Sequence, residues 1–287
     1  MRWRCRDRVF DLGERTLVMG ILNVTPDSFS DGGRFFEPKA AIERGLALIG
    51  EGADLVDVGG ESTRPGSAPV AAEEQWRRIG PVLQALAGRT VLSVDTSSAW
   101  VAERALMAGA QVVNDVTALG DPAMAEVVTR AAAGLVLMHM QGTPLTMQRS
   151  PHYDDAVSEV REGLARRWQR AHGAGVQDEA VALDPGIGFG KALEHNLALL
   201  TGYAELAALG RPVVVGVSRK SFLGRLLDRE VDERLEGALA ATAIAVFQGA
   251  AIVRTHDVTA TARAVRVADA LRAARSGRSA ARRGASA

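Results

Sequence analysis

The chain has 287 residues, with 34 Lys plus Arg against 34 Asp plus Glu, so its formal net charge is zero. A balanced charge argues against a nucleic-acid or membrane-surface protein, and any bound anion must be held by local donors. The single cysteine, Cys5, excludes an internal disulfide and a cysteine-based metal cluster, which points to a reducing cytoplasm. No apolar run approaches the roughly 18–20 residues of a membrane span, and the Arg-rich start lacks the apolar region of a signal peptide.

Short apolar runs alternate with Ala- and Leu-rich amphipathic stretches along most of the chain. The apolar runs predict buried parallel strands at Leu17–Leu22, Asp54–Val58, Val91–Val94, Gln111–Asn114, Gly134–Met138, Ala180–Leu183, Pro212–Val217 and Ala251–Arg254. The stretches between them predict helices at Pro38–Gly50, Ala71–Ala87, Ser97–Ala108, Pro122–Ala132, Ala156–Gly173, Leu193–Leu209, Glu233–Gly249 and Thr259–Ala274.

Eight strands alternating with eight helices indicate an α/β fold, a single-domain (β/α)8 TIM barrel. A doubly wound open sheet is the competing arrangement, but it usually carries a GxGxxG turn after its first strand, and "NVTPDSFSDGG" is not such a turn. We expect "FDLGERTLVMG" to form a short N-terminal hairpin that plugs the bottom of the barrel. The barrel domain then spans residues 1–274, and the small, basic residues 275–287 form a disordered tail.

Polar residues follow the predicted strands, at the barrel end where such folds place their chemistry. They are Asn23, Asp57, Asp95, Asn114, Asp115, His139, Asp184, Lys191, Lys220, Arg254 and His256. Taken singly, Asp95 could cap a helix, His139 could be a satisfied core histidine, and Asp57 and Asp115 could brace loop amides. Because unpaired buried carboxylates are costly, the whole set instead predicts one ligand-binding mouth.

The chemistry of this mouth divides into two halves. Carboxylates, an amide and an ammonium group suit a flat polar heterocycle, whereas Arg64, Arg219, Lys220, Arg254 and His256 suit an anion. Strands seven and eight commonly hold phosphate in TIM barrels, and a helix starting near Ser221 adds backbone N–H donors. No Ser-His-Asp arrangement or paired Glu is evident, and the histidines lack the neighbours of a zinc site. A hard cation held by Asn23 and substrate phosphate oxygens is expected instead.

Several motifs occur in one order between Leu17 and Val267: "GILNVTPDSFSDGG", "DVGGESTRPGS", "SVDTS", "VNDV", "LMHMQGTPLTMQ", "LDPGIGFGK", "VSRKSFLG" and "VRTHDV". Together they resemble the dihydropteroate synthase family. That family joins 6-hydroxymethyl-7,8-dihydropterin diphosphate to 4-aminobenzoate in folate biosynthesis. The resemblance implies small-molecule substrates, Mg²⁺ as cofactor, a homodimer, and a protein that sulfonamides target.

The resemblance also assigns roles to residues of this chain. Catalysis falls to Asn23, Asp184, Lys220, Arg254 and His256. Pterin contacts are Asp95, Asn114, Met138, Asp184, Lys220 and Arg254, and diphosphate contacts are Asn23, Thr63, Arg64, Arg254 and His256. Aminobenzoate contacts are Phe29, Thr63, Pro65, Phe189, Lys220 and Ser221. Asp31 and Arg64 belong to loops that close, and Asn23 binds the metal.

The expected reaction is an SN1-like loss of diphosphate assisted by Mg²⁺. A pterin-binding methyltransferase is the alternative enzyme, but "SRKSF" and "RTHD" supply carboxylate and diphosphate sites that it has no reason to keep. A non-catalytic, synthase-like pterin-binding paralogue is the second alternative; the intact "ESTRPGS" and "SRK" segments count against it. On the late helices, Leu239, Ile244 and Val246 could form a subunit interface or only the barrel wall, and core is the preferred interpretation.

Overall fold

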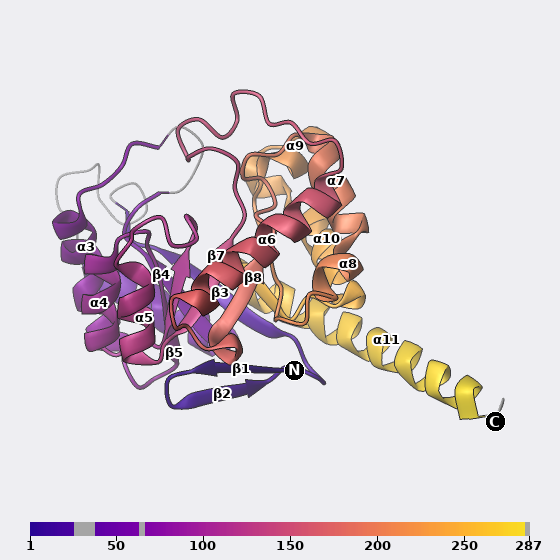
Figure 1. Cartoon of the computed structure of the whole chain (residues 1–287), viewed down its shortest axis with the longest axis horizontal. Helices are drawn as coiled ribbons and strands as arrows, with labels where there is room; N and C mark the ends of the chain where they lie inside the picture. The colour runs from indigo at the N-terminus through magenta and orange to yellow at the C-terminus, as the bar shows by residue number, and fades with distance from the viewer. Residues whose placement is uncertain (26–37, 63–66, 285–287) are drawn as a thin grey trace.

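The computed structural model describes residues 1–25, 38–62 and 67–284. Within them, eight parallel strands form one sheet in the order β8-β7-β6-β5-β4-β3-β10-β9, and a bridge between Leu183 and Val213 closes it. The strands are β3 (Leu17–Asn23), β4 (Leu55–Gly59), β5 (Val91–Asp95), β6 (Val112–Asp115), β7 (Gly134–Met138), β8 (Val181–Asp184), β9 (Val214–Gly216) and β10 (Ile252–Thr255). The TIM-barrel prediction is confirmed (Figure 1).

Helices surround the barrel, and most follow the predicted ranges (Figure 1). They are α2 (Pro38–Gly50), α3 (Ala72–Leu86), α4 (Ala99–Met107), α5 (Met124–Ala131), α6 (Ala156–Gly173), α7 (Leu193–Thr201), α8 (Tyr203–Ala207), α9 (Ser221–Leu227), α10 (Leu235–Gln248) and α11 (Val258–Gly284), with 3₁₀ turns η1 (Asp178–Ala180) and η2 (Val231–Glu233). Local chemistry sets their ends: Asp155 Oδ1 accepts from the backbone N–H groups of Val157 and Ser158 at the start of α6. Gly249 ends α10 at φ 118°.

Two predicted helices differ from the structure. The single helix expected over Leu193–Leu209 is two helices, because Gly202 interrupts it and the buried Tyr203 donates its hydroxyl to Val214 O at 2.6 Å. The last helix, expected to end at Ala274, continues as α11 to Gly284, so residue 274 is not an element boundary. In Figure 1 this helix runs outward beyond the barrel. Among the helices described, none has both the length and the apolar character needed to cross a membrane.

The strands are buried on both faces, which accounts for their apolar runs. Val56 and Val58 of β4 pack outward against the helices, whereas Leu55 points inward to the lower layer of the barrel. Asp57, one step above Leu55 on the same inward face, is also fully buried. The lumen is therefore apolar at its N-terminal end and polar at its C-terminal end, where the strand ends present their side chains.

An N-terminal hairpin closes the bottom of the barrel, as expected, but its residues differ from the prediction. β1 (Arg2–Cys5) pairs antiparallel with β2 (Arg8–Asp11), whereas the sequence placed a hairpin over "FDLGERTLVMG". Trp3 and Cys5 are fully buried in the lower layer, and Trp3 Nε1 donates to Ala180 O at 2.9 Å. The turn at Arg6 has φ 59°, which ordinary turn signals do not predict.

Candidate active site

Four strands bring buried polar side chains together in the upper lumen. Arg254 of β10 donates from Nε to Asp57 Oδ2 and from Nη2 to Asp95 Oδ2, each at 2.7 Å. Asn114 of β6 donates from Nδ2 to the same Asp57 Oδ2 at 3.0 Å. Because β3 and β4 separate β10 from β5, the Arg254 side chain must cross the lumen to reach Asp95. We call these four residues the lumen cluster.

The lumen cluster has unmet capacity to accept hydrogen bonds. Among the described residues, Asp57 Oδ1, Asp95 Oδ1 and Ser93 Oγ are buried atoms without a hydrogen-bond partner. Burial raises the pKa of Asp95 to about 7. The positive charge of Arg254 opposes this rise, and the negative charge of Asp57 adds to it. Burial disfavours the charge of Arg254, but Asp57 and Asp95 outweigh it and raise the pKa of Arg254. A ligand that donates hydrogen bonds here would remove a desolvation cost.

A second acid–base pair lies on the β8 and β9 side of the lumen. Asp184, at the end of β8, is buried and accepts from Gly186 N at 2.7 Å, while Lys220 Nζ donates to Ile187 O. Burial raises the pKa of Asp184, and the charges of Lys220 and Arg254 oppose this rise, which places both cations near it. Burial lowers the pKa of Lys220 to about 8, against the opposing effect of Asp184.

The loop after β8 carries Phe189 beside this pair. Lys220 Nζ lies 4.5 Å from the centroid of the Phe189 ring, a cation–π geometry. Gly188 has φ 83°, and a Cβ there would lie 3.0 Å from Lys220 Cδ, so glycine is needed for this approach. Phe189 itself is half-buried.

Lys191 was named among the strand-end residues but given no role, and the structure shows what it contacts. Its side chain is fully buried, and Nζ donates to Phe189 O at 2.9 Å and His139 O at 3.3 Å. His139 is buried, and burial with the nearby Lys191 lowers its pKa to about 2, so it is neutral. The interpretation of His139 as a satisfied core histidine is therefore confirmed. The pattern of charged residues in the sequence does not predict that Lys191 is buried, because its ammonium group contacts backbone oxygens rather than carboxylates.

The rim beyond β10 carries His256 and an ion pair. Ser218 Oγ lies 3.1 Å from His256 Nδ1 and 3.3 Å from Asp257 Oδ2. Arg219 donates from Nη2 to Asp257 Oδ1 at 2.9 Å. Partial burial would raise the pKa of Asp257, but the hydrogen bond and positive charge of Arg219 outweigh burial and lower this pKa. The sequence predicted the cations of this rim but not that Ser218 and Asp257 orient them.

The remaining predicted residues lie at neighbouring strand ends or outside the described residues. Met138 is buried at the end of β7, and Ser221 is exposed at the first position of α9. Asn23 is half-buried at the end of β3, paired in register with Gly59. The predicted loop residues that lie outside the described residues are Phe29, Asp31, Thr63, Arg64 and Pro65.

The donor chemistry at Asn23 fits magnesium. In the described ranges no three His, Cys, Asp or Glu side chains group as a metal site, so an all-protein cage is absent there. The carboxamide of Asn23 makes no hydrogen bond with the described residues, which leaves its oxygen able to coordinate. Mg²⁺ commonly takes one or two protein oxygens and completes its shell with water and substrate phosphates.

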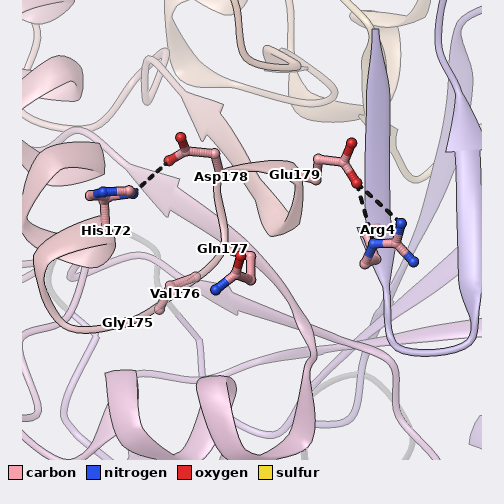
Figure 2. Close-up of a pocket in the computed structure, with 7 residues that line it drawn as sticks. All are labelled: Arg4, His172, Gly175, Val176, Gln177, Asp178 and Glu179. Carbon is pink, nitrogen blue, oxygen red and sulfur yellow. Dashed lines mark hydrogen bonds and ion pairs between the residues drawn. The ribbon is translucent and has the colours of Figure 1, made fainter.

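A recess of about 250 Å³ lies at the opposite end of the barrel, between β1 and the turn that precedes β8 (Figure 2). It is lined by Arg4, His172, Gly175, Val176, Gln177, Asp178 and Glu179. Its polar side chains pair with each other: Arg4 forms an ion pair with Glu179 at 3.2 Å, and His172 Nδ1 lies 3.1 Å from Asp178 Oδ1. Because these pairs are satisfied and far from the strand ends that carry the lumen cluster, the recess is not the candidate active site.

Comparisons with known proteins agree with this geometry. The profile of a family described as "Pterin binding enzyme" matches residues 19–256. Dihydropteroate synthase of Escherichia coli (strain K12) is 47% identical over 255 residues, covering 88% of this chain and 90% of that protein. Dihydropteroate synthase of Xanthomonas albilineans with 4-aminobenzoic acid has a TM-score of 0.88 at 45% identity, covering 95% and 98% of the two chains. The same enzyme with 7,8-dihydropteroate has a TM-score of 0.85 at 42% identity, covering 95% and 99%. The chain therefore belongs to the dihydropteroate synthase family of pterin-binding enzymes.

Proposed function

We propose that this protein condenses 6-hydroxymethyl-7,8-dihydropterin diphosphate with 4-aminobenzoate, releasing 7,8-dihydropteroate and diphosphate by a dissociative route. The observation that carries the proposal is the content of the lumen, where buried acceptors on Asp95 and Asp184 lie with the donors of Lys220 and Arg254. The Xanthomonas albilineans relative, solved with 4-aminobenzoic acid and with 7,8-dihydropteroate, supports these substrates.

The pterin ring occupies the upper lumen in this proposal. Its N–H and amino groups donate to Asp95, Asn114 and Asp184, and its carbonyl accepts from Lys220. Met138 and Arg254 pack against its faces. The ring satisfies Asp95 Oδ1, which has no partner among the described residues and therefore gains most from a ligand donor.

In this proposal the diphosphate lies at the rim, where Arg254 and His256 would face it and Asn23 would hold Mg²⁺. Thr63 and Arg64, which the family resemblance assigns to the same group, lie outside the described residues. When bound, the ion supplies charge neutralisation to the departing oxygens. In this proposal Arg254 and His256 donate to the charge on the departing diphosphate. Ser218 holds the His256 ring through its contact with Nδ1.

The chemical step breaks the C–O bond of the exocyclic methylene, and its electron pair leaves with the diphosphate. Positive charge spreads into the reduced pterin, where the carboxylate of Asp184 stabilises the ring N–H groups. The amino nitrogen of 4-aminobenzoate then forms the C–N bond with its lone pair and loses a proton to solvent water. Phe189 walls the aminobenzoate ring, and Lys220 and Ser221 lie beside its carboxylate. Phe29 and Pro65, with the closing residues Asp31 and Arg64, stay predictions.

A turnover assay separates this proposal from its alternatives. Diphosphate release, coupled to a pyrophosphatase, is measured with pterin diphosphate and Mg²⁺, with and without 4-aminobenzoate. We expect release that forms 7,8-dihydropteroate and that falls when Mg²⁺ is removed with a chelator. Pterin binding without any turnover would favour a non-catalytic paralogue. Methyl transfer from a methylated pterin to a corrinoid protein would favour the methyltransferase.

The proposal extends to a homodimer that works in the cytoplasm. Ile244 of α10 is 53% exposed, and Val267 and Leu271 of α11 are 62% and 57% exposed, so three large apolar side chains face outward on two packed helices. The interpretation of Val246 as core is confirmed, whereas that of Ile244 is wrong. Sedimentation should give a dimer for wild type and a monomer for Ile244→Glu; a monomeric wild type would refute the assembly. The cytoplasmic location stays a prediction from the single, buried Cys5.

A further inference from the structure

Asp57 is the centre of the lumen cluster, although neither the resemblance nor the proposed reaction gives it a role. Its side chain is fully buried, and a single oxygen, Oδ2, accepts both Arg254 Nε at 2.7 Å and Asn114 Nδ2 at 3.0 Å. The chain positions that it joins lie on β4, β6 and β10. A buried carboxylate with two donors on one oxygen restricts how both donor side chains can face the lumen.

The restriction matters most for Asn114, because an amide can present either of its ends. An ionised carboxylate only accepts, so the Asn114 atom opposite Asp57 must be the nitrogen. Its carbonyl oxygen Oδ1 then has no donor among the described residues and is left for a ligand. Arg254 is restricted too: with Nε on Asp57, its Nη2 extends to Asp95.

We propose that Asp57 is a positioning residue that makes Asn114 a hydrogen-bond acceptor toward the substrate ring and thereby selects rings that carry an amino group. The proposal rests on the proposed function, since it deepens how the same lumen recognises a pterin. A ring that presents a carbonyl where the pterin presents its 2-amino group would place two acceptors opposite each other. Such a pair costs the desolvation of both groups, so the lumen discriminates against it.

The experiment compares the dissociation constants of two probes, 6-hydroxymethylpterin and 6-hydroxymethyllumazine, in which a carbonyl replaces the 2-amino group. Wild type should bind the pterin at least about ten-fold more tightly, the effect of one unmatched buried hydrogen bond. In Asp57→Asn the amide at this position can donate to Asn114 Oδ1, so Asn114 can turn its N–H groups to the ligand. The pterin-to-lumazine preference should then fall several-fold, which a loss of stability alone would not cause.

Three further variants serve as controls. Ser93→Ala alters the register partner of Asp57 on β5, a buried hydroxyl without a partner among the described residues, and should keep the wild-type preference. Asn114→Ala should lose the preference, and adding Asp57→Asn to it should change the preference no further, because Asp57 acts through Asn114. An unchanged preference in folded Asp57→Asn, or an additive double variant, overturns the inference. Absence of pterin binding and of turnover in wild type overturns the proposed function instead.

If Asp57→Asn does not fold, wild type alone tests the geometry. The side-chain amide protons of Asn114, identified by the signals that vanish in Asn114→Ala, are followed by hydrogen exchange in the ligand-free protein. One proton should be protected by its bond to Asp57. Free exchange of both protons would show that the amide turns, and would overturn the inference.

Discussion

Replacing Arg254 with Met leaves two buried carboxylates without the cation that lies between them. Asp57 and Asp95 each accept from Arg254 at 2.7 Å, and both are almost fully buried. Removing one partner of a buried ion pair costs about 3–5 kcal/mol. An unfolding entropy of about 2.1 cal/mol/K per residue gives about 0.6 kcal/mol/K for 287 residues. We therefore expect Arg254→Met to lower the melting temperature by about 5–8 °C at pH 8.

The effect depends on pH because Asp95 has a pKa of about 7 in the folded protein, against 3.8 ordinarily. A carboxyl with a raised folded-state pKa binds more protons when folded, so its contribution to stability is lost as the pH rises from about 4 to about 7. Arg254 lowers the pKa of Asp95. In Arg254→Met this pKa is therefore higher, and the contribution of Asp95 to stability is lost over a range that extends to higher pH. At pH 5.5 Asp95 is protonated in both proteins, and the shift in melting temperature should be about half of that at pH 8.

Scanning calorimetry of the ligand-free proteins at pH 5.5 and pH 8 provides the test. Arg4→Met is the matched control: it removes an arginine whose partner Glu179 is also partly exposed, so its loss should cost at most about 1 kcal/mol at either pH. Equal shifts for Arg254→Met at the two pH values would refute the electrostatic reasoning. A shift at pH 8 no larger than that of the control would show that Arg254 does not stabilise the two carboxylates.

Three other substitutions test separate parts of the structure. Asp184→Asn keeps the size of a proposed pterin contact but removes its charge, and calorimetry should show about a 100-fold loss of affinity for pterin diphosphate; near wild-type affinity would contradict the role. Phe189→Ala should raise the KM for 4-aminobenzoate much more than that for pterin diphosphate, and equal increases would count against the ring contact. Trp3→Ala should cost about 3–5 kcal/mol of stability with little change in KM; an unchanged melting temperature would show that the hairpin is not a plug.

Hydrophobic pattern predicted the barrel well because parallel strands buried on both faces leave continuous apolar runs. Gly134–Met138 and Ala156–Gly173 match their elements at both ends. The N-terminal turn was missed because tertiary contacts fix it: Arg6 N donates to Ala132 O at 2.8 Å, and its guanidinium donates to Leu106 O at 2.9 Å. Such contacts make a positive φ tolerable at arginine, and the neighbouring sequence does not reveal them.

The sequence predicted which residues at the strand ends form the candidate site, but not which hydrogen bonds these residues make with each other. The sequence left open that Asp57 braces loop amides, whereas in the structure it binds the side chains of Asn114 and Arg254. The Arg254 side chain is long enough to cross the lumen, and a strand pattern fixes where a side chain starts rather than where it ends. The bond from Arg254 to Asp95 spans 159 positions of sequence, so neither local spacing nor periodicity could predict it.

The charges in the lumen also bear on the order of chemical events. Asp57, Asp95 and Asp184 face Arg254 and Lys220, so carboxylates outnumber these cations when all are ionised. Burial raises the pKa of Asp95 and Asp184, so the ligand-free lumen disfavours the ionised form of both carboxyl groups. A neutral ring relieves this only by hydrogen bonding, whereas a ring that gains positive charge as the diphosphate leaves also relieves it electrostatically. Because this gain is larger in the transition state than in the ground state, it supports the proposed order, in which C–O cleavage precedes C–N bond formation.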